Sequence, residues 1–548
     1  MNTQQFLHYA GFKNRYSVKI IFPLNNKIYE MRRSTILLFS ILTSLSMGFA
    51  KNDTIFVKAH TFNGIIEGYE DSGIKFFKGV PYAQPPVGKL RWREPQVLAG
   101  WQGVKKAHNF GNRAMQLPLY PDMRFRSENI NEDCLYLNIW SPAKTETDRL
   151  PVLIYFHGGG FVTGDGSEYR YDGESMARQG IVVVTVNYRL GIFGFFSHPE
   201  LTRESPHNAS GNYGFLDQNA ALKWIKANIG NFGGNPERIT IGGESAGGSS
   251  VNAHMASPLS KHIIAGAIGQ SGSLLGLRNI ATLKQAEQSG LEFAKQINAL
   301  SLEDLREIPA GKLLELSKNL NIAGQGLIVD GYFFTEKPDE TFLKGTQSQI
   351  PLLIGWNTLE MGYKSLFGNQ PATVENYRQI ITARYPSHAS ELLNLYKVET
   401  EEQLPVVASD LAGDLFMAYN AWEWANLHSK TSQKPVYRYI FSRIRTECDK
   451  ENMAIGAIHS GEIEYLLGNM PSYQRIHCWE PEDYKISQIA QSYLVNFIKT
   501  GNPNGIAVPL WTPIKRNIAS DVLNMDATTR MEKEKRRERY LWWNKKLF

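Results

Sequence analysis

The sequence predicts an α/β protein in which helices flank a large, mostly parallel central sheet. Buried apolar runs at residues 152–156, 181–186 and 350–355 alternate with loops and helical patterns. This alternation is typical of parallel strands that are joined by covering helices. Short alternating segments at residues 55–57 and 64–69 predict a small antiparallel region before the main sheet.

Two later stretches predict further helices. Apolar residues recur at helical spacing within residues 275–325, so we expect helical insertions over the sheet and the active site. The charged run at residues 531–539 is followed by aromatic residues, which predicts a surface helix. The sequence has no repeat and no linker rich in Pro, Gly or Ser, so we expect a single domain over residues 51–548.

The formal net charge of +6 lies almost entirely in the first 50 residues. These hold six Lys and Arg and one Glu, which leaves +1 for the rest of the chain. The folded part is therefore near neutral, and composition gives no reason to expect nucleic-acid binding. With 42% hydrophobic residues, the chain can bury a large core.

Residues 1–50 predict a leader that contains a secretory signal peptide. Two arginines directly follow Met31, and an apolar run at residues 36–50 ends in small residues of the kind that a signal peptidase reads. Met31 is then the expected translation start, and we expect export to a secreted or periplasmic location. A transmembrane anchor is the alternative. The run is short and interrupted by Ser and Thr, so we expect no stable membrane anchor.

The three cysteines, Cys134, Cys448 and Cys478, are too few for a disulfide framework. Cys448 and Cys478 either close a loop in an oxidising compartment or remain separate buried thiols. Their spacing fits no metal-binding motif, and the sequence contains no other such motif. We therefore expect neither a metal nor a cofactor.

The candidate nucleophile is Ser245. It lies in the pattern G-x-S-x-G at residues 243–247, between a short apolar strand and the start of a helix. A serine on such a sharp turn has strained backbone geometry, and side chains at the flanking glycines would collide with the strand and the helix. The free N–H groups of the helix start would face a negative oxygen that forms beside the serine.

Two further stretches accompany this pattern, FKGVPYAQPPVG at residues 77–88 and NEDCLYLNIW at residues 131–140. Together with GESAGG, and in this order, they resemble the type-B carboxylesterase and cholinesterase family over residues 55–547. The resemblance implies the α/β-hydrolase fold. It also implies a serine carboxylesterase that hydrolyses small-molecule carboxylic esters through an acyl-enzyme on Ser245.

A serine nucleophile needs a base and a carboxylate, and in this fold they follow the serine in the order acid, then histidine. The family places its acid in a G-x-N-x-x-E loop, which residues 355–360 match, so the resemblance assigns the acid to Glu360. His459 lies in a glycine-bounded loop close to the family's histidine loop and is the expected base.

The sequence HGGG at residues 157–160 is the turn that brings backbone N–H groups close to the scissile carbonyl in this fold. We expect an oxyanion hole formed by the N–H groups of Gly159, Gly160 and Ala246. The resemblance also places three side chains in a buried layer behind the triad: Glu244, Glu462 and Ser271.

The chain departs from the family at one cysteine. Ala114 stands where relatives often carry the partner of the cysteine at Cys134, so that disulfide is missing and the intervening loop is less tethered.

Two alternatives stay open for the function. One is an esterase for acetyl or feruloyl groups on polysaccharide. The other is a non-catalytic binding relative, which the intact triad disfavours.

Overall fold

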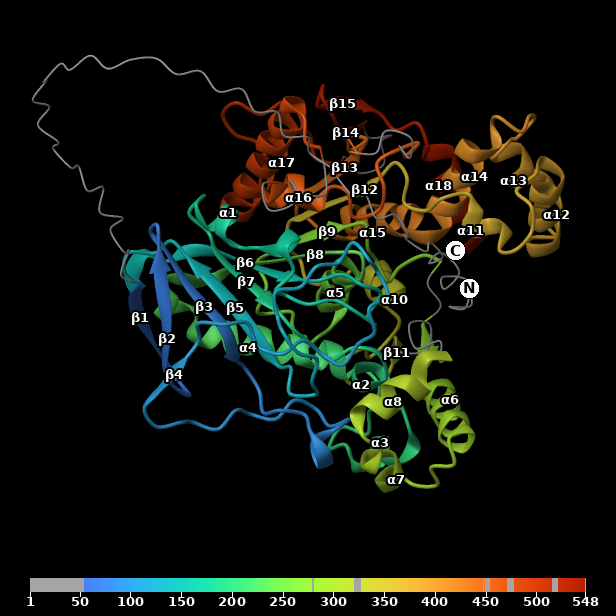
Figure 1. Ribbon diagram of the computed structural model, residues 1–548. Helices are drawn as coiled ribbons and strands as arrows, with labels where there is room; N and C mark the ends of the chain where they lie inside the picture. Colours follow the sequence, from blue (N-terminus) through green and yellow to red (C-terminus); the bar gives the residue numbers. More distant parts are fainter. Residues whose placement is uncertain are drawn as a thin grey trace, which may run out of the picture. The chain divides into compact units, whose positions relative to one another are not determined.

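A large mixed sheet runs through the described part of the chain (Figure 1). The computed structural model describes residues 54–277, 280–319, 327–446, 448, 454–470, 478–514 and 521–547. The expected leader, with its signal peptide and the start at Met31, lies outside these residues. Residues Ile55–Phe548 form one compact unit.

The middle of the sheet is parallel, which confirms the predicted architecture. The apolar runs that predicted its strands are buried; β7, for example, is buried at every position. Its members, in their order across the sheet, are β7 (Val182–Val186), β6 (Leu150–Phe156), β8 (Gly234–Glu244), β9 (Gly266–Gln270), β12 (Leu352–Asn357), β13 (Val436–Phe441) and β14 (Asp521–Met525).

The N-terminal edge of the sheet is antiparallel, as the alternating segments predicted. Figure 1 shows the first of these strands in blue. They are β1 (Ile55–Thr61), β2 (Gly64–Asp71), β3 (Ile74–Pro81) and β5 (Tyr136–Ser141), and the short β4 (Val104–Lys106) pairs with β2 in parallel.

The opposite edge corrects one prediction. Part of the charged run at residues 531–539 is strand β15 (Arg530–Lys533), which pairs with β14 in antiparallel, and helix α18 begins only at Arg537. A run of mixed charges suits the exposed side of an edge strand as well as it suits a surface helix, so the charges alone could not separate the two. The aromatic residues do anchor α18 (Arg537–Leu547), since Tyr540 and Trp543 are buried.

Helices cover both faces of the sheet because side chains alternate along each strand. In β6, Val152, Ile154 and Phe156 enter one core cluster, whereas Leu153 and Tyr155 enter the other. Helices α4 (Tyr213–Asn228), α5 (Ala246–Ala256) and α15 (Tyr419–Thr431) supply residues to the first cluster. Helix α17 (Pro481–Thr500) and the short α16 (Ile463–Leu467) supply the second.

The remaining α-helices join these layers or lie in the insertions. They are α1 (Glu174–Ala177), α2 (Gly191–Phe195), α3 (Pro199–Glu204), α6 (Leu283–Gln296), α7 (Leu302–Glu307), α8 (Ala310–Leu316), α10 (Pro338–Lys344), α11 (Lys364–Phe367), α12 (Val374–Arg384), α13 (Ala389–Leu395) and α14 (Leu404–Gly413).

The insertion that was expected at residues 275–325 contains α6, α7 and α8. It also has a feature that helical spacing did not predict, since β10 (Ala281–Thr282) pairs in parallel with β11 (Ile328–Val329). The guanidinium of Arg91 donates to the carbonyls of Leu305 and Ile308 at 3.3 and 2.7 Å, which ties the end of α7 to the segment that follows residues 77–88.

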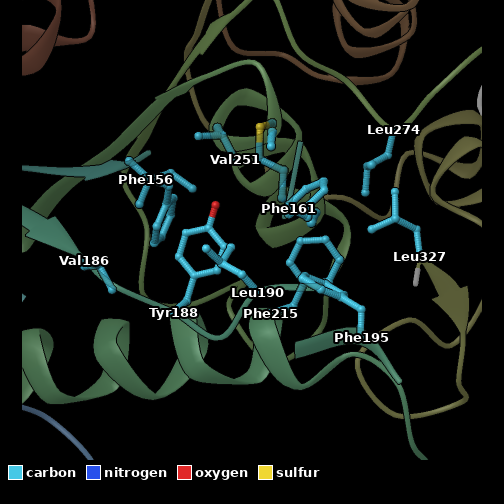
Figure 2. Packing of buried hydrophobic residues seen from close by; sticks show 14 of the residues in the cluster. Phe156, Phe161, Val186, Tyr188, Leu190, Phe195, Phe215, Val251, Leu274 and Leu327 are labelled. Carbon is cyan, nitrogen blue, oxygen red and sulfur yellow. The ribbon is translucent and has the colours of Figure 1, made fainter. Parts of the chain in front are cut away.

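Aromatic packing fills the larger core cluster. Figure 2 shows the rings of Phe161, Phe195 and Phe215 facing one another, and their centroids lie 5.2 to 5.5 Å apart in edge-to-face arrangements. Such pairs add to the free energy gained from burying apolar area. This packing adjoins the turn that follows β6, because Phe161 belongs to that turn.

Cys448 and Cys478 form a disulfide, which resolves the alternative that the sequence left open. Cys134 is buried and free.

Among the helices that the structure describes, none is long and apolar enough to cross a bilayer.

Candidate active site

The loops that follow four neighbouring parallel strands meet at one edge of the sheet. Strands β6, β8, β9 and β12 end there, and backbone hydrogen bonds link the residues that come next: Ser245 donates to the Gln270 carbonyl at 2.8 Å, and Ser271 donates to the Gly355 carbonyl at 2.9 Å. In open α/β sheets, ligand sites lie outside the carboxyl ends of the strands. The expected nucleophile, base and acid all come from these loops or from a loop packed beside them.

Ser245 occupies the strained turn that the sequence predicted. It connects β8 directly to α5 and has φ of 56° and ψ of −117°, which few residues with a side chain adopt. A Cβ on Gly247 would lie 2.0 Å from the carbonyl oxygen of Phe156, so only glycine allows α5 to approach β6 this closely. The turn therefore depends on a glycine in the G-x-S-x-G pattern.

The structure brings Ser245, His459 and Glu360 together. The Nε2 atom of His459 lies 3.0 Å from Ser245 Oγ, and its Nδ1 atom lies 2.5 Å from Glu360 Oε2. Ser245 and Glu360 are almost fully buried, whereas a quarter of the His459 side chain is exposed. The imidazole thus lies between a hydroxyl and a carboxylate, which is the arrangement that lets histidine act as a base toward serine.

Glu360 is fixed by two donors to its second oxygen. The hydroxyl of Ser271 donates to Glu360 Oε1 at 2.7 Å, and the backbone N–H of Asn357 donates to the same oxygen at 2.6 Å. The Nδ2 of Asn357 donates in turn to Glu462 Oε2 at 2.5 Å. Ser271 and Glu462 therefore lie in the buried layer behind the triad, where the resemblance placed them.

Glu244, the third residue expected in that layer, faces the base itself. Its Oε1 lies 3.2 Å from His459 Nε2. Burial raises the pKa of Glu244 to about 8, against the attraction of His459. Burial and repulsion from Glu360 likewise raise the pKa of Glu462 to about 7. At neutral pH, Glu244 is therefore mostly protonated and carries little charge toward the imidazole.

Opposing effects act on His459. Burial lowers the pKa of the imidazole, but the carboxylates of Glu244 and Glu360 attract its proton more strongly and raise the pKa to about 9. The part of the rise in the His459 pKa that comes from Glu244 exists only when Glu244 is ionised. Because Glu244 is mostly neutral at pH 7, the base loses its proton more readily there than the fully charged cluster would allow.

The turn after β6 presents the N–H groups expected for an oxyanion hole. Gly159 and Gly160 have φ of 105° and 64°, and a Cβ on Gly159 would lie 2.1 Å from the Thr163 carbonyl oxygen. Within the residues that the structure describes, neither glycine N–H donates to another protein group. Ala246 begins α5, where the N–H has no intrahelical acceptor.

Two residues that contact His459 or the residue after it were not predicted from the sequence. Asp414–Ala418 forms a π-helical turn between α14 and α15, and from this turn the Phe416 ring meets the imidazole edge to face at 5.2 Å. Such turns are often found at functional sites. The second neighbour is Arg170, whose Nη1 lies 3.3 Å from the Oγ of Ser460, the residue after His459. Neither residue belongs to a recognisable motif, so no sequence signal pointed to them.

Over the described ranges, no group of three or more His, Cys, Asp or Glu side chains has a geometry that could hold a metal ion.

Comparison with known proteins gives consistent matches. The model of a family described as "Carboxylesterase family" matches residues 53–543. The chain is 37% identical to fumonisin B1 esterase of Sphingopyxis macrogoltabida, over 77% of this chain and 76% of the relative. It is 33% identical to para-nitrobenzyl esterase of Bacillus subtilis (strain 168), over 87% and 96% of the two chains. A solved structure of a PNB esterase superimposes with a TM-score of 0.76 at 30% identity and covers 90% of this chain and 99% of that one.

Proposed function

The chain belongs to the carboxylesterase family and is a carboxylic ester hydrolase, and we propose that it acts through an acyl-enzyme formed on Ser245. The observation that carries this proposal is the continuous contact from Ser245 Oγ through the His459 imidazole to Glu360, with distances of 3.0 and 2.5 Å. A hydroxyl is a poor nucleophile at neutral pH unless such a base takes its proton.

In the first half of the proposed reaction, His459 takes the proton of Ser245 as Oγ attacks the ester carbonyl. The carbonyl oxygen becomes negative and accepts hydrogen bonds from the N–H groups of Gly159, Gly160 and Ala246. His459 then gives its proton to the departing alcohol, and the acyl group stays on Ser245.

In the second half, water attacks the acyl-enzyme with the same groups in the same roles. His459 takes a proton from the water and returns it to Ser245 Oγ as the carboxylic acid leaves. Glu360 accepts the Nδ1–H of His459, which keeps Nε2 directed at Ser245 and stabilises the imidazolium that forms in each half. Ser271 and Asn357 hold Glu360 in that orientation.

We propose small carboxylic esters as the substrates. The names of the two relatives indicate different substrates, a fumonisin and a para-nitrobenzyl ester. We expect the purified protein to hydrolyse neutral esters of short to medium acyl chains with a kcat/KM at least about tenfold above that for choline esters, a difference of about 1.4 kcal/mol. The sequence has no tryptophan between Trp101 and Trp140 to hold a quaternary ammonium, and the intervening segment carries Arg124 and Arg126, which would repel it. A panel of esters graded by acyl length and alcohol measures this. Faster release from polysaccharide would favour the alternative, and no turnover of any ester would favour a binding role.

The pH dependence should report the charge of Glu244. In the wild type, Glu244 ionises near pH 8, and its charge then helps to hold the proton on His459. Glu244→Gln carries no charge at any pH, so its imidazole should become a free base at lower pH. We expect the rising limb of kcat/KM to move down by about one pH unit.

The measurement is kcat/KM for a neutral ester between about pH 5 and 10. The remaining charged groups near His459, Glu360 and Glu462, stay in place in the variant. Glu237→Gln removes an exposed carboxylate near the start of β8, at the opposite end of the strand from Glu244. This control should leave the rising limb of kcat/KM at its wild-type pH. A limb that stays fixed or moves up in Glu244→Gln would contradict this electrostatic account.

We propose in addition that the chain is exported and that the mature protein begins at Lys51. The disulfide between Cys448 and Cys478 supports this, because disulfides persist in oxidising compartments. We expect the intact mass of the exported protein to match a chain from Lys51 with these two cysteines oxidised. A mature N-terminus before Met31, or an uncleaved segment that retains the protein in the membrane, would contradict the proposal.

A further inference from the structure

Arg170 connects the turn that carries the base to two other parts of the site. It lies in the 3-10 turn Tyr169–Tyr171, and only 5% of its side chain is exposed. Its Nε donates to Glu168 Oε1 at 2.5 Å, and its Nη1 lies 3.2 Å from Asp122 Oδ2 and 3.3 Å from Ser460 Oγ. One buried guanidinium thus holds three side chains that are far apart in the sequence.

The contact with Ser460 joins Arg170 to the turn at residues 458–461, which carries the base and which we call the base turn. His459 and Ser460 are the central residues of a turn that closes when Gly461 N–H donates to the Ile458 carbonyl at 3.0 Å. Ser460 has φ of 64°, a left-handed conformation that a serine adopts only when its surroundings hold it. A small rotation of this turn would move the imidazole, because His459 is the residue before Ser460.

The contact with Asp122 reaches the loop beside the oxyanion turn. The Asp122 side chain is 62% exposed, and Tyr120, two residues earlier, places its hydroxyl 3.6 Å from the position that a Cβ on Gly160 would occupy. The same guanidinium therefore touches the base turn and the loop that borders the oxyanion donors.

The backbone of Arg170 is itself fixed. Asn469 Nδ2 donates to the Arg170 carbonyl at 2.8 Å and to the Asp172 carbonyl at 2.9 Å. Burial raises the pKa of Glu168, and the attraction of Arg170 opposes this rise. The arginine thus extends to the Ser460 turn from a fixed backbone and is paired with a buried carboxylate.

We propose that Arg170 is a positioning residue for the reaction: it holds the His459–Ser460 turn against the loop at residues 120–126, so that Nε2 stays within reach of Ser245. This rests on the proposed role of His459 as the base. Arg170 touches neither the nucleophile nor the acid, so it acts through Ser460.

The test separates positioning from stability. Arg170→Met leaves Glu168 buried without its partner and should lower both the melting temperature and the activity. Glu168→Leu combined with Arg170→Leu replaces the pair by apolar side chains, an exchange that often restores stability. We expect kcat per active site, titrated with a phosphonate, to fall by about tenfold or more in both variants, with KM changed less than about threefold.

Three further variants refine the comparison. Ser460→Ala removes one contact without exposing a buried charge, and Arg170→Lys keeps the charge but cannot reach all three partners, so both should give intermediate losses of kcat. Arg178→Met, which breaks an exposed pair with Glu174, should match the wild type. If the double leucine variant regains both the wild-type melting temperature and the wild-type kcat, Arg170 is only structural and the inference is wrong. An active Ser245→Ala protein would instead refute the proposed function itself.

Discussion

We expect Ser245→Ala to lower kcat for ester hydrolysis by about a thousandfold or more while the chain remains folded. The variant removes only a hydroxyl that contacts His459 Nε2, so the packing of the turn at Ser245 should survive. His459→Ala should lose a similar factor, because the three residues act as a unit. Glu360→Gln should lose less, since it still occupies the space between Ser271 and His459. Initial rates of a neutral ester, with protein purified away from host esterases, measure these losses.

Ser289→Ala is the matched control for this experiment. It removes an exposed hydroxyl on α6 that bonds only to the backbone of its own helix, at 3.2 Å, and should keep wild-type kcat. If Ser245→Ala retained most of the activity, another residue would be the nucleophile. A loss that accompanied unfolding, seen by circular dichroism, would mean that the turn and not the hydroxyl had been tested.

We expect Gly159→Ala to lower kcat by about a hundredfold or more, through the loss of oxyanion donors. The added Cβ would lie 2.1 Å from the Thr163 carbonyl oxygen, on a backbone with φ of 105°. Neither the Thr163 carbonyl nor a left-handed alanine can accommodate this easily, so the turn has to move and its N–H groups with it. Steady-state kinetics with a neutral ester, together with thermal melting, separate the loss of rate from the loss of stability.

Gly230→Ala gives the comparison for a glycine of ordinary conformation. Nothing lies within 4 Å of the position of its added Cβ, so this variant should keep wild-type kcat. Wild-type turnover by a folded Gly159→Ala protein would show that the turn after β6 does not stabilise the transition state.

The parts of the fold that the sequence predicted are those in which one physical requirement leaves a regular pattern. Fully buried strands such as β7 need continuous apolar runs. The turn at Ser245 needs a nearby glycine because α5 approaches β6 so closely. The triad acid and base have no comparable requirement that leaves a pattern in their neighbouring residues. Glu360 and His459 were found only through the family pattern and the order of the chain.

The parts that could not be predicted depend on contacts between distant segments. Arg170 meets Ser460 across 290 positions in the sequence, and Phe416 contacts His459 from a π-helical turn. Asn357 lies inside the pattern that identified the acid, but its bonds to Glu360 and to Glu462 form only in the folded chain. The charges at residues 531–539 fit a surface helix and an edge strand equally well, and pairing with β14 places the first of them in strand β15.

Covalent labelling tests the central claim most directly. The full chain is treated with a fluorophosphonate, digested, and analysed by mass spectrometry, in parallel with Ser245→Ala and with wild type unfolded before treatment. We predict one adduct per chain, on the peptide that contains Ser245, and no adduct in the other two samples. The adduct should form at the same rate at which the ester-hydrolysing activity is lost. An adduct on a different residue, or equal labelling of Ser245→Ala, would contradict the proposal that Ser245 is the nucleophile.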